Sequence, residues 1–194
     1  MRRFILSVAA SILFLGGWRS AEAGLIANGD FETGNLSGWT KNGNIFAFHS
    51  FDGFLPNGGS VFAALGDAFS LGTLSQTIND TAGEHYDLSL HLGSDGETPN
   101  EFKIAWNGKT LYDQTNLPDT RSNVSQYNLL SFPVVGTGSD TLTLSERNDR
   151  GSLALDDVSL DAVPDSAAPE PSTLVIASVA LGAFAARRMR RVRG

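Results

Sequence analysis

The sequence predicts an all-β protein: an antiparallel β-sandwich or jelly roll, flanked by an N-terminal signal peptide and a short C-terminal transmembrane helix. Three observations lead to this fold class. Between residues 24 and 160, apolar and polar residues alternate repeatedly, which is the period of half-buried strands. Gly, Asn, Asp and Ser separate these segments and favour turns. The unbroken apolar stretches of the chain lie near its two ends, each beside arginines.

Length, composition and charge exclude several classes of function. The chain has 194 residues, enough for one compact domain. It contains no cysteine, which excludes disulfides, thiolate metal sites and a cysteine nucleophile. Residues 24–168 carry six Lys and Arg against 19 Asp and Glu, a balance of −13. Phosphate backbones repel such a body, so we expect no binding to nucleic acid.

The N-terminus has the three parts of a secretory signal peptide. Met1-Arg2-Arg3 is a short basic start, residues 4–17 (FILSVAASILFLGG) are apolar or small, and Ala21-Glu22-Ala23 is typical of a cleavage site. A retained membrane anchor would need about 20 apolar residues, and this stretch is about 14 long. We therefore assign residues 1–23 to a signal peptide. It directs export of the protein by the Sec machinery and is removed after Ala23.

Residues 24–160 divide into strands where the alternation runs. Apolar residues occupy every second position from Tyr86 to Leu92 and from Phe102 to Trp106. Asn107-Gly108 favours a type I′ turn and predicts a hairpin to a strand at residues 110–112. Further strands are expected at residues 45–49, 61–65, 74–78, 126–135, 141–144 and 153–160. Short strands at this spacing favour a sandwich or jelly roll.

After the last strand the composition changes twice. Residues 161–168 (DAVPDSAA) are small or contain proline and predict a flexible linker. Residues 173–186 are apolar, but a helix of this length rises only about 21 Å, so it spans the bilayer only if the arginine stems snorkel. The arginines that follow predict that this end stays in the cytoplasm and that everything before the helix lies outside. They are Arg187, Arg188, Arg190, Arg191 and Arg193.

The C-terminal 26 residues resemble a known sorting signal. Pro169-Glu170-Pro171, the apolar run and the arginine cluster together look like the PEP-CTERM signal of Gram-negative bacteria, over residues 169–194. The resemblance implies that exosortase, a membrane protease-transpeptidase, recognises Pro169, Glu170 and Pro171. It also implies that the five arginines stop transfer, and that the protein is released or transferred to the cell surface.

A second resemblance covers Leu25 to Leu160. Five short motifs in order are similar to the galactose-binding-like jelly rolls of carbohydrate-binding modules: LIANGDFE at 25–32, Gly38-Trp39, LSQTI at 74–78, YDLS at 86–89 and LDDVSL at 155–160. In such modules the opening segment and the closing Asp-Asp-Val strand are neighbours, and a calcium ion often bridges them.

This resemblance implies a candidate calcium site. Glu32 and Asp156 become the first candidate ligands, followed by Asp30 and Asp157. Calcium takes six to eight oxygen ligands, and carboxylates brought together from the two ends of the domain would repel one another without a cation. The alternative is that these acids form turns and are solvated, as most are in so acidic a domain.

Sugar recognition needs an aromatic platform edged by polar side chains. Trp39 and Trp106 are expected in the core, Trp39 because its family counterpart packs there and Trp106 because it alternates with other apolar residues. The remaining candidates for a ligand surface, with loop packing as their alternative, are Tyr112, Tyr127, Phe51 and Phe54.

The sequence shows no catalytic motif. His-Glu-x-x-His, Gly-x-Ser-x-Gly and nucleotide-binding glycine patterns are absent. Glycoside hydrolysis needs two acids about 5–9 Å apart across a cleft. Among so many acids chance pairs are abundant, for example Glu97 with Glu101 and Glu146 with Asp149.

The sequence therefore predicts a non-catalytic protein that binds polysaccharide. We expect it to be exported, held in the inner membrane during sorting, and then placed on the cell surface or in the extracellular matrix. Its expected partners are the Sec machinery, exosortase, the membrane and an exopolysaccharide. The first alternative is a structural matrix or adhesin subunit that binds protein partners without sugar, and a more distant one is a glycoside hydrolase.

Overall fold

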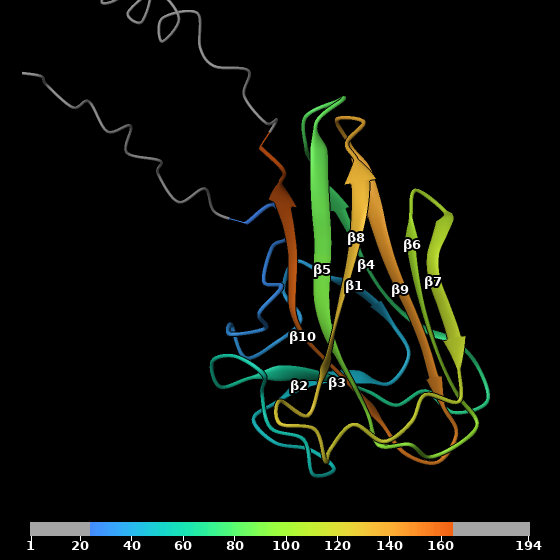
Figure 1. Cartoon of the computed structure of the whole chain (residues 1–194). Coiled ribbons are helices and arrows are strands. Elements are labelled where there is room, and N and C mark those ends of the chain that lie inside the picture. Colours follow the sequence, from blue (N-terminus) through green and yellow to red (C-terminus); the bar gives the residue numbers. More distant parts are fainter. Residues whose placement is uncertain (1–23, 165–194) are drawn as a thin grey trace, which may run out of the picture.

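The chain folds into a sandwich of two antiparallel sheets with five strands each (Figure 1). The computed structural model describes residues 24–164. The first sheet has the order β1-β4-β9-β6-β7, with β1 (Thr40–Asn42), β4 (Gly72–Ile78), β6 (Asn100–Trp106), β7 (Lys109–Thr115) and β9 (Asp140–Asn148). The second has the order β2-β3-β10-β5-β8, with β2 (Ile45–Phe48), β3 (Phe62–Leu65), β5 (His85–Ser94), β8 (Asn128–Val135) and β10 (Leu153–Ala162).

The all-β, antiparallel prediction is confirmed for residues 24–164, which contain no helix. Within this range there is accordingly no helix long and apolar enough to cross a membrane. The predicted signal peptide and the predicted C-terminal transmembrane helix lie outside the described residues. So do the Pro169-Glu170-Pro171 motif and the five arginines after the apolar run.

The alternation of the sequence reappears as an alternation of burial. In β5, β6 and β9, every second side chain points into the space between the sheets and is buried there. Trp39 and Trp106 both belong to this main core, as expected. The aromatic core therefore serves packing, and these two rings are not available to a ligand.

The predicted hairpin is present, one strand was not expected, and several strands run past their predicted ends. Asn107 and Gly108 have φ of 50° and 75°, as a type I′ turn requires, and β6 pairs with β7 across them. Strand β1 was not expected, because its three residues are all exposed and show no alternation; it forms by pairing with β4. Strand β10 continues to Ala162, so the first two residues of the predicted linker extend the strand.

The two ends of the domain lie side by side, as the resemblance implied. The backbone N–H of Val158 donates to the carbonyl of Gly29 over 2.9 Å. A bulge in β10 between Asp156 and Ser159 makes this contact, and Asp157 within it has φ of 48°. The bulge takes Asp157 and Val158 out of the ladder with β5, and the side chains of Asp156 and Asp157 both bind a neighbouring loop.

That neighbour is the segment of residues 49–61 between β2 and β3, here called the anchored loop. It packs on the outer face of the second sheet and forms a second, smaller core there. Within it, Phe51 and Phe54 exchange backbone hydrogen bonds of 3.2 and 2.8 Å around the Asp52-Gly53 turn. The second core contains Phe54, Phe62, Ala64, Tyr127 and Ala154, with Phe48 packed against it.

A buried carboxyl group joins the first sheet to the loop after β3. Glu146 of β9 is 1% exposed, and it accepts the backbone N–H of Asp67 at 3.1 Å from Oε1 and 3.4 Å from Oε2. Burial, together with the carboxyl of Asp67 beside it, raises the pKa of Glu146 to about 8 from an ordinary 4.5.

Replacing this group should change how stability depends on pH. Between about pH 4.5 and 8 the folded chain keeps a proton on Glu146 that the unfolded chain releases, so the free energy of unfolding falls as pH rises across this window. Glu146→Gln stays neutral and should lose less stability between these limits, by on the order of 3 kcal/mol. Urea unfolding near both limits measures the difference. The control Glu97→Gln alters an exposed glutamate, and its free energy of unfolding should fall with pH as much as that of the wild type. An equal fall in Glu146→Gln would contradict the raised pKa of Glu146.

Candidate functional site

Carboxylates from both ends of the domain hold the anchored loop. Glu32 accepts the backbone N–H of Ser60 at 2.7 Å and of Val61 at 2.8 Å, and the Ser60 hydroxyl donates to it over 2.9 Å. These bonds lower the pKa of Glu32. A methyl group on Gly59 would lie 2.3 Å from Glu32 Oε1, so only glycine lets the loop approach this closely.

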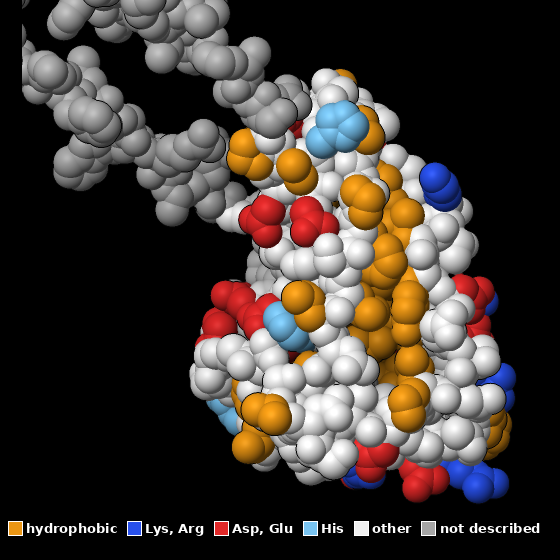
Figure 2. All heavy atoms as spheres, viewed as in Figure 1, with side chains coloured by type: hydrophobic (Ala, Val, Ile, Leu, Met, Phe, Trp, Pro, Cys, Tyr) orange, Lys and Arg blue, Asp and Glu red, His pale blue; other side chains and the backbone are white. Residues whose placement is uncertain are grey.

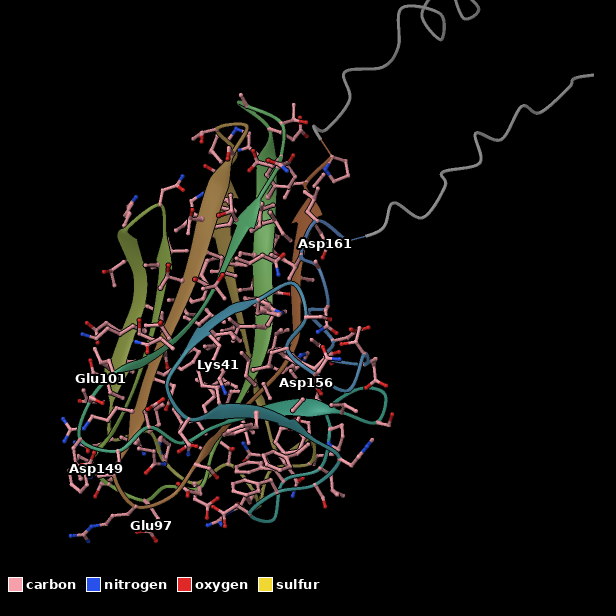
Figure 3. The ribbon with its side chains drawn as sticks, turned by 180° about the vertical axis from the view of Figure 1, so that it is seen from behind. Lys41, Glu97, Glu101, Asp149, Asp156 and Asp161 are labelled. Atoms are coloured by element: carbon pink, nitrogen blue, oxygen red, sulfur yellow. The ribbon has the colours of Figure 1, made fainter. Side chains whose placement is uncertain are left out.

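Asp156 and Asp157 hold the same loop from strand β10. Asp156 Oδ2 accepts the N–H of Asn57 at 2.8 Å and of Gly58 at 3.3 Å. The side-chain amide of Asn57 donates to Asp157 over 2.8 Å. Burial and the neighbouring charge of Asp157 raise the pKa of Asp156 to about 7, while its N–H donors oppose this shift. Figure 3 shows Asp156 on β10 beside the blue and teal segments near the N-terminal end of the domain.

Asp30 has a different environment from the other three candidates. It is exposed and accepts the backbone N–H of Glu32 over 3.3 Å, which is a local turn bond. It shares an open depression with Asp157 and His91, whose Nδ1 lies 3.8 Å from Asp157 Oδ2.

The donor chemistry of this region fits calcium, since carboxylate, amide and backbone oxygens are the ligands that calcium takes. The observed arrangement fits less well. Among residues 24–164, no three acidic or histidine side chains converge as a metal site. Glu32 and Asp156 instead accept hydrogen bonds from N–H groups of the anchored loop. These bonds lower the pKa of Glu32, whereas burial still raises the pKa of Asp156.

Two of the four aromatic candidates are packing residues. Phe54 is 1% and Tyr127 is 4% exposed, and both lie in the second core. The Tyr127 hydroxyl donates to the carbonyl of Leu55 over 2.9 Å, so its polar end is satisfied inside the protein. For these two rings the structure favours the packing alternative over a ligand surface.

Tyr112 lies on β7, the edge strand of the first sheet. Its ring contacts Phe132 of β8 edge to face, with 6.1 Å between centroids, and it is half-buried. Figure 2 shows a column of apolar side chains beside β8, on the side where edge strands β7 and β8 face each other. The hollow next to Tyr112 measures only about 20 Å³, which is the space of about one water molecule and too little for a sugar ring.

Phe51 belongs to an exposed cluster that we call the aromatic surface, formed with Phe46 and Phe48. Phe51 stacks on Phe48 with centroids 4.7 Å apart and an angle of 18°, and Phe46 lies 6.4 Å from Phe48. Phe46 is 49% and Phe51 42% exposed. A hollow of about 250 Å³ opens beside the three rings. Of the four aromatic candidates, Phe51 alone borders a space that could admit a sugar ring.

Sequence reasoning missed Phe46 and Phe48, although a signal for them was present. In the segment IFAF of β2, Ile45 points inward, so period two places Phe46 and Phe48 on the outer face. Two large apolar residues on the outward positions of a half-buried strand are unusual enough to mark a covered or functional surface.

The acidic pairs considered for hydrolysis do not form exposed pairs. Glu146 is buried, and Asp149 is bound by Arg147 over 2.6 Å. Glu101 pairs with Lys103 over 2.7 Å, and Figure 3 shows Glu101 well separated from Glu97.

No protein-family model matches the chain, and no curated protein sequence matches it. Solved structures with similar folds include TmCBM61 in complex with β-1,4-galactotriose, with a TM-score of 0.56 and 18% identity over 73% of this chain and 99% of that one. Another is the CBM22-1-CBM22-2 tandem of Paenibacillus barcinonensis Xyn10C, with a TM-score of 0.51 and 20% identity over 78% of this chain and 48% of the tandem. A third is the enzymatically active domain of tailspike protein 4 of bacteriophage CBA120, with a TM-score of 0.51 and 15% identity over 72% of this chain and 21% of that domain. The described domain thus has the jelly-roll fold of carbohydrate-binding modules.

Proposed function

We propose that this protein binds polysaccharide without catalysis, at the surface of the cell or in its extracellular matrix. The observation that carries the proposal is the aromatic surface with its adjoining hollow, on a fold shared with the galactotriose-bound TmCBM61. Apolar ring faces flanked by a few polar groups suit the C–H face and the hydroxyl rim of a sugar. Phe51 is the central contact of this site. Tyr112 packs against β8, at the edge of the sandwich opposite to β2, and is not part of it.

Export and sorting complete the proposal and rest on the sequence at the two termini. The Sec machinery exports the chain and residues 1–23 are removed. Exosortase then acts at Pro169-Glu170-Pro171 while the short apolar helix and its arginines hold the chain in the inner membrane. The mature protein meets an exopolysaccharide outside.

We also propose that the carboxylates around the anchored loop, first Glu32 and Asp156, bind a calcium ion. Glu32, Asp156 and Asp157 reach the loop from two sides and supply hard oxygen ligands, with Asp30 at the edge. Bound calcium would neutralise the charge of these carboxylates, which in this structure accept hydrogen bonds from N–H groups of the loop.

Polysaccharide binding is tested with the full chain and insoluble or soluble polysaccharide from the host envelope. We expect saturable co-sedimentation or retention. Phe51→Ala should weaken it about tenfold, the equivalent of about 1.4 kcal/mol. Tyr112→Ala should leave it unchanged, because Tyr112 lies at the opposite edge of the sandwich. Binding to matrix proteins with indifference to every polysaccharide would favour the structural or adhesin role, and the apolar column beside β8 would then be the surface to examine.

Sorting is tested by deleting Pro169 to Pro171 in a host that contains exosortase. The shortened chain should remain in the membrane fraction with its C-terminal tail uncut, because the protease has lost its recognition element. Cell fractionation and the mass of the recovered protein measure this. A deleted chain that is still cut and released would contradict the assignment.

Calcium binding is tested by the melting temperature of the full chain in EDTA and in millimolar calcium. A bound ion stabilises the folded state by mass action, so the melting temperature should rise. The rise should be larger near pH 8 than near pH 6, because below its pKa of about 7 the Asp156 carboxyl holds a proton that calcium must displace. An unchanged melting temperature at both pH values rejects the site.

A further inference from the structure

The aromatic surface is built on the edge of the second sheet. Strand β2 is the last strand on that side, and its outward positions carry Phe46 and Phe48. The Asp52-Gly53 turn then brings Phe51 back to stack on Phe48. Three rings from six consecutive residues therefore form one patch, whose outer rings remain about half exposed.

Exposing these rings to water is unfavourable, by roughly 25 cal/mol for each Å² of apolar surface. Single exposed apolar side chains are common and carry no meaning, but a contiguous cluster beside a hollow marks a surface that binds something. The second core beneath buries Phe54 and Phe62 and has Phe48 packed against it, whereas Phe46 and Phe51 remain exposed.

The floor of the hollow is made of backbone. Gly66 and Gly151 line it together with Ala64, and a methyl group on Gly66 would lie 3.4 Å from the Asn44 amide nitrogen and 3.6 Å from the Gly151 carbonyl oxygen. These three lining residues carry at most a methyl group, so they take up little of the space beside the rings. Asn44 stands at its rim, where its amide donates to the Gly66 carbonyl over 3.1 Å.

The residues that line the hollow carry no charge. They are Asn44, Phe46, Phe48, Phe51, Ala64, Leu65, Gly66 and Gly151. One cation borders the aromatic surface: the ammonium of Lys41 lies 3.9 Å from the Phe46 ring centroid and donates to the Ile45 carbonyl over 2.8 Å. Residues 24–164 carry 18 Asp and Glu against six Lys and Arg, so the field of the whole domain repels a polyanion.

From this geometry we infer that the aromatic surface, with the glycine floor and Asn44 at its rim, is a binding site for pyranose rings of a neutral polysaccharide. The rings cover an apolar C–H face of the sugar, and the amide and backbone groups at the rim bind hydroxyls. Acidic polysaccharides are excluded by charge. The inference rests on the proposed function and adds to it the ligand class and the roles of Asn44 and the backbone beside the rings.

The test is affinity electrophoresis of the full chain through gels that contain a neutral polymer, either β-1,4-galactan or xylan, or the acidic polymer polygalacturonate, or the host's own exopolysaccharide. Phe46→Ala and Phe51→Ala each remove an exposed ring and should weaken retention by a neutral polymer about tenfold. The matched control Phe69→Ala removes a ring that is 80% exposed on another loop and should change nothing. Thermal unfolding of each variant confirms that it still folds.

The outcomes separate this inference from the proposed function. Retention by a neutral polymer that is weakened by both variants and unaffected by Phe69→Ala supports the site. Retention by polygalacturonate that Lys41→Gln abolishes, or retention that neither phenylalanine variant changes, overturns the site and its ligand class while polysaccharide binding stands. Absence of retention by every polymer overturns the proposed function as well.

Discussion

The aromatic surface depends on how the anchored loop is attached to the rest of the domain. Residues 49–61 have no regular ladder of their own beyond the Phe51–Phe54 bridge, and their backbone N–H groups must be satisfied by other parts of the chain. Glu32 and Asp156 do this from the two ends of the domain, and the Gln126 side chain binds both Leu55 N–H and the Gly53 carbonyl. The position of Phe51 is therefore set by residues that are far away in sequence.

The same attachments explain how a strongly acidic domain tolerates buried carboxylates. Asp156 is fully buried and accepts N–H groups of Asn57, Gly58 and its neighbour Asp157. Hydrogen bonds to a carboxylate offset part of the cost of removing it from water. For Asp156 they offset it only in part, since burial and the charge of Asp157 still raise its pKa to about 7. Burial likewise raises the pKa of Glu146, which has a single N–H donor, to about 8. Both buried acids therefore keep a proton over much of the pH range in which an exposed carboxyl is ionised.

Local pattern was enough to predict the sandwich but not the site. Alternation and the Asn107-Gly108 turn gave the strands of the interior, because burial in a two-layer sheet repeats every two residues. The motif order also placed the opening segment beside Asp156 and Asp157. No local pattern predicts which aromatic candidates are buried. Phe51 and Phe54 are three residues apart in one turn, and packing on the second sheet buries Phe54 while Phe51 stays exposed. Strand β1 was missed for the same reason, since its three exposed residues owe their conformation to β4.

The two ends of the described domain lie close together and away from the aromatic surface. Gly24 and Ala162 line one hollow, so the chain enters and leaves the described domain at nearly the same place, beside the end of β10 (Figure 1). The anchored loop lies toward the opposite end of the sandwich. A tether attached beyond residue 164 would therefore leave the aromatic surface free to meet a polymer. The likeness to carbohydrate-binding modules fixes the fold and leaves the ligand open, because specificity is carried by side chains grafted on the loops and edges of that fold. In this chain those side chains are uncharged rings on an acidic body, and under the proposed function this contrast favours a neutral chain over a charged one.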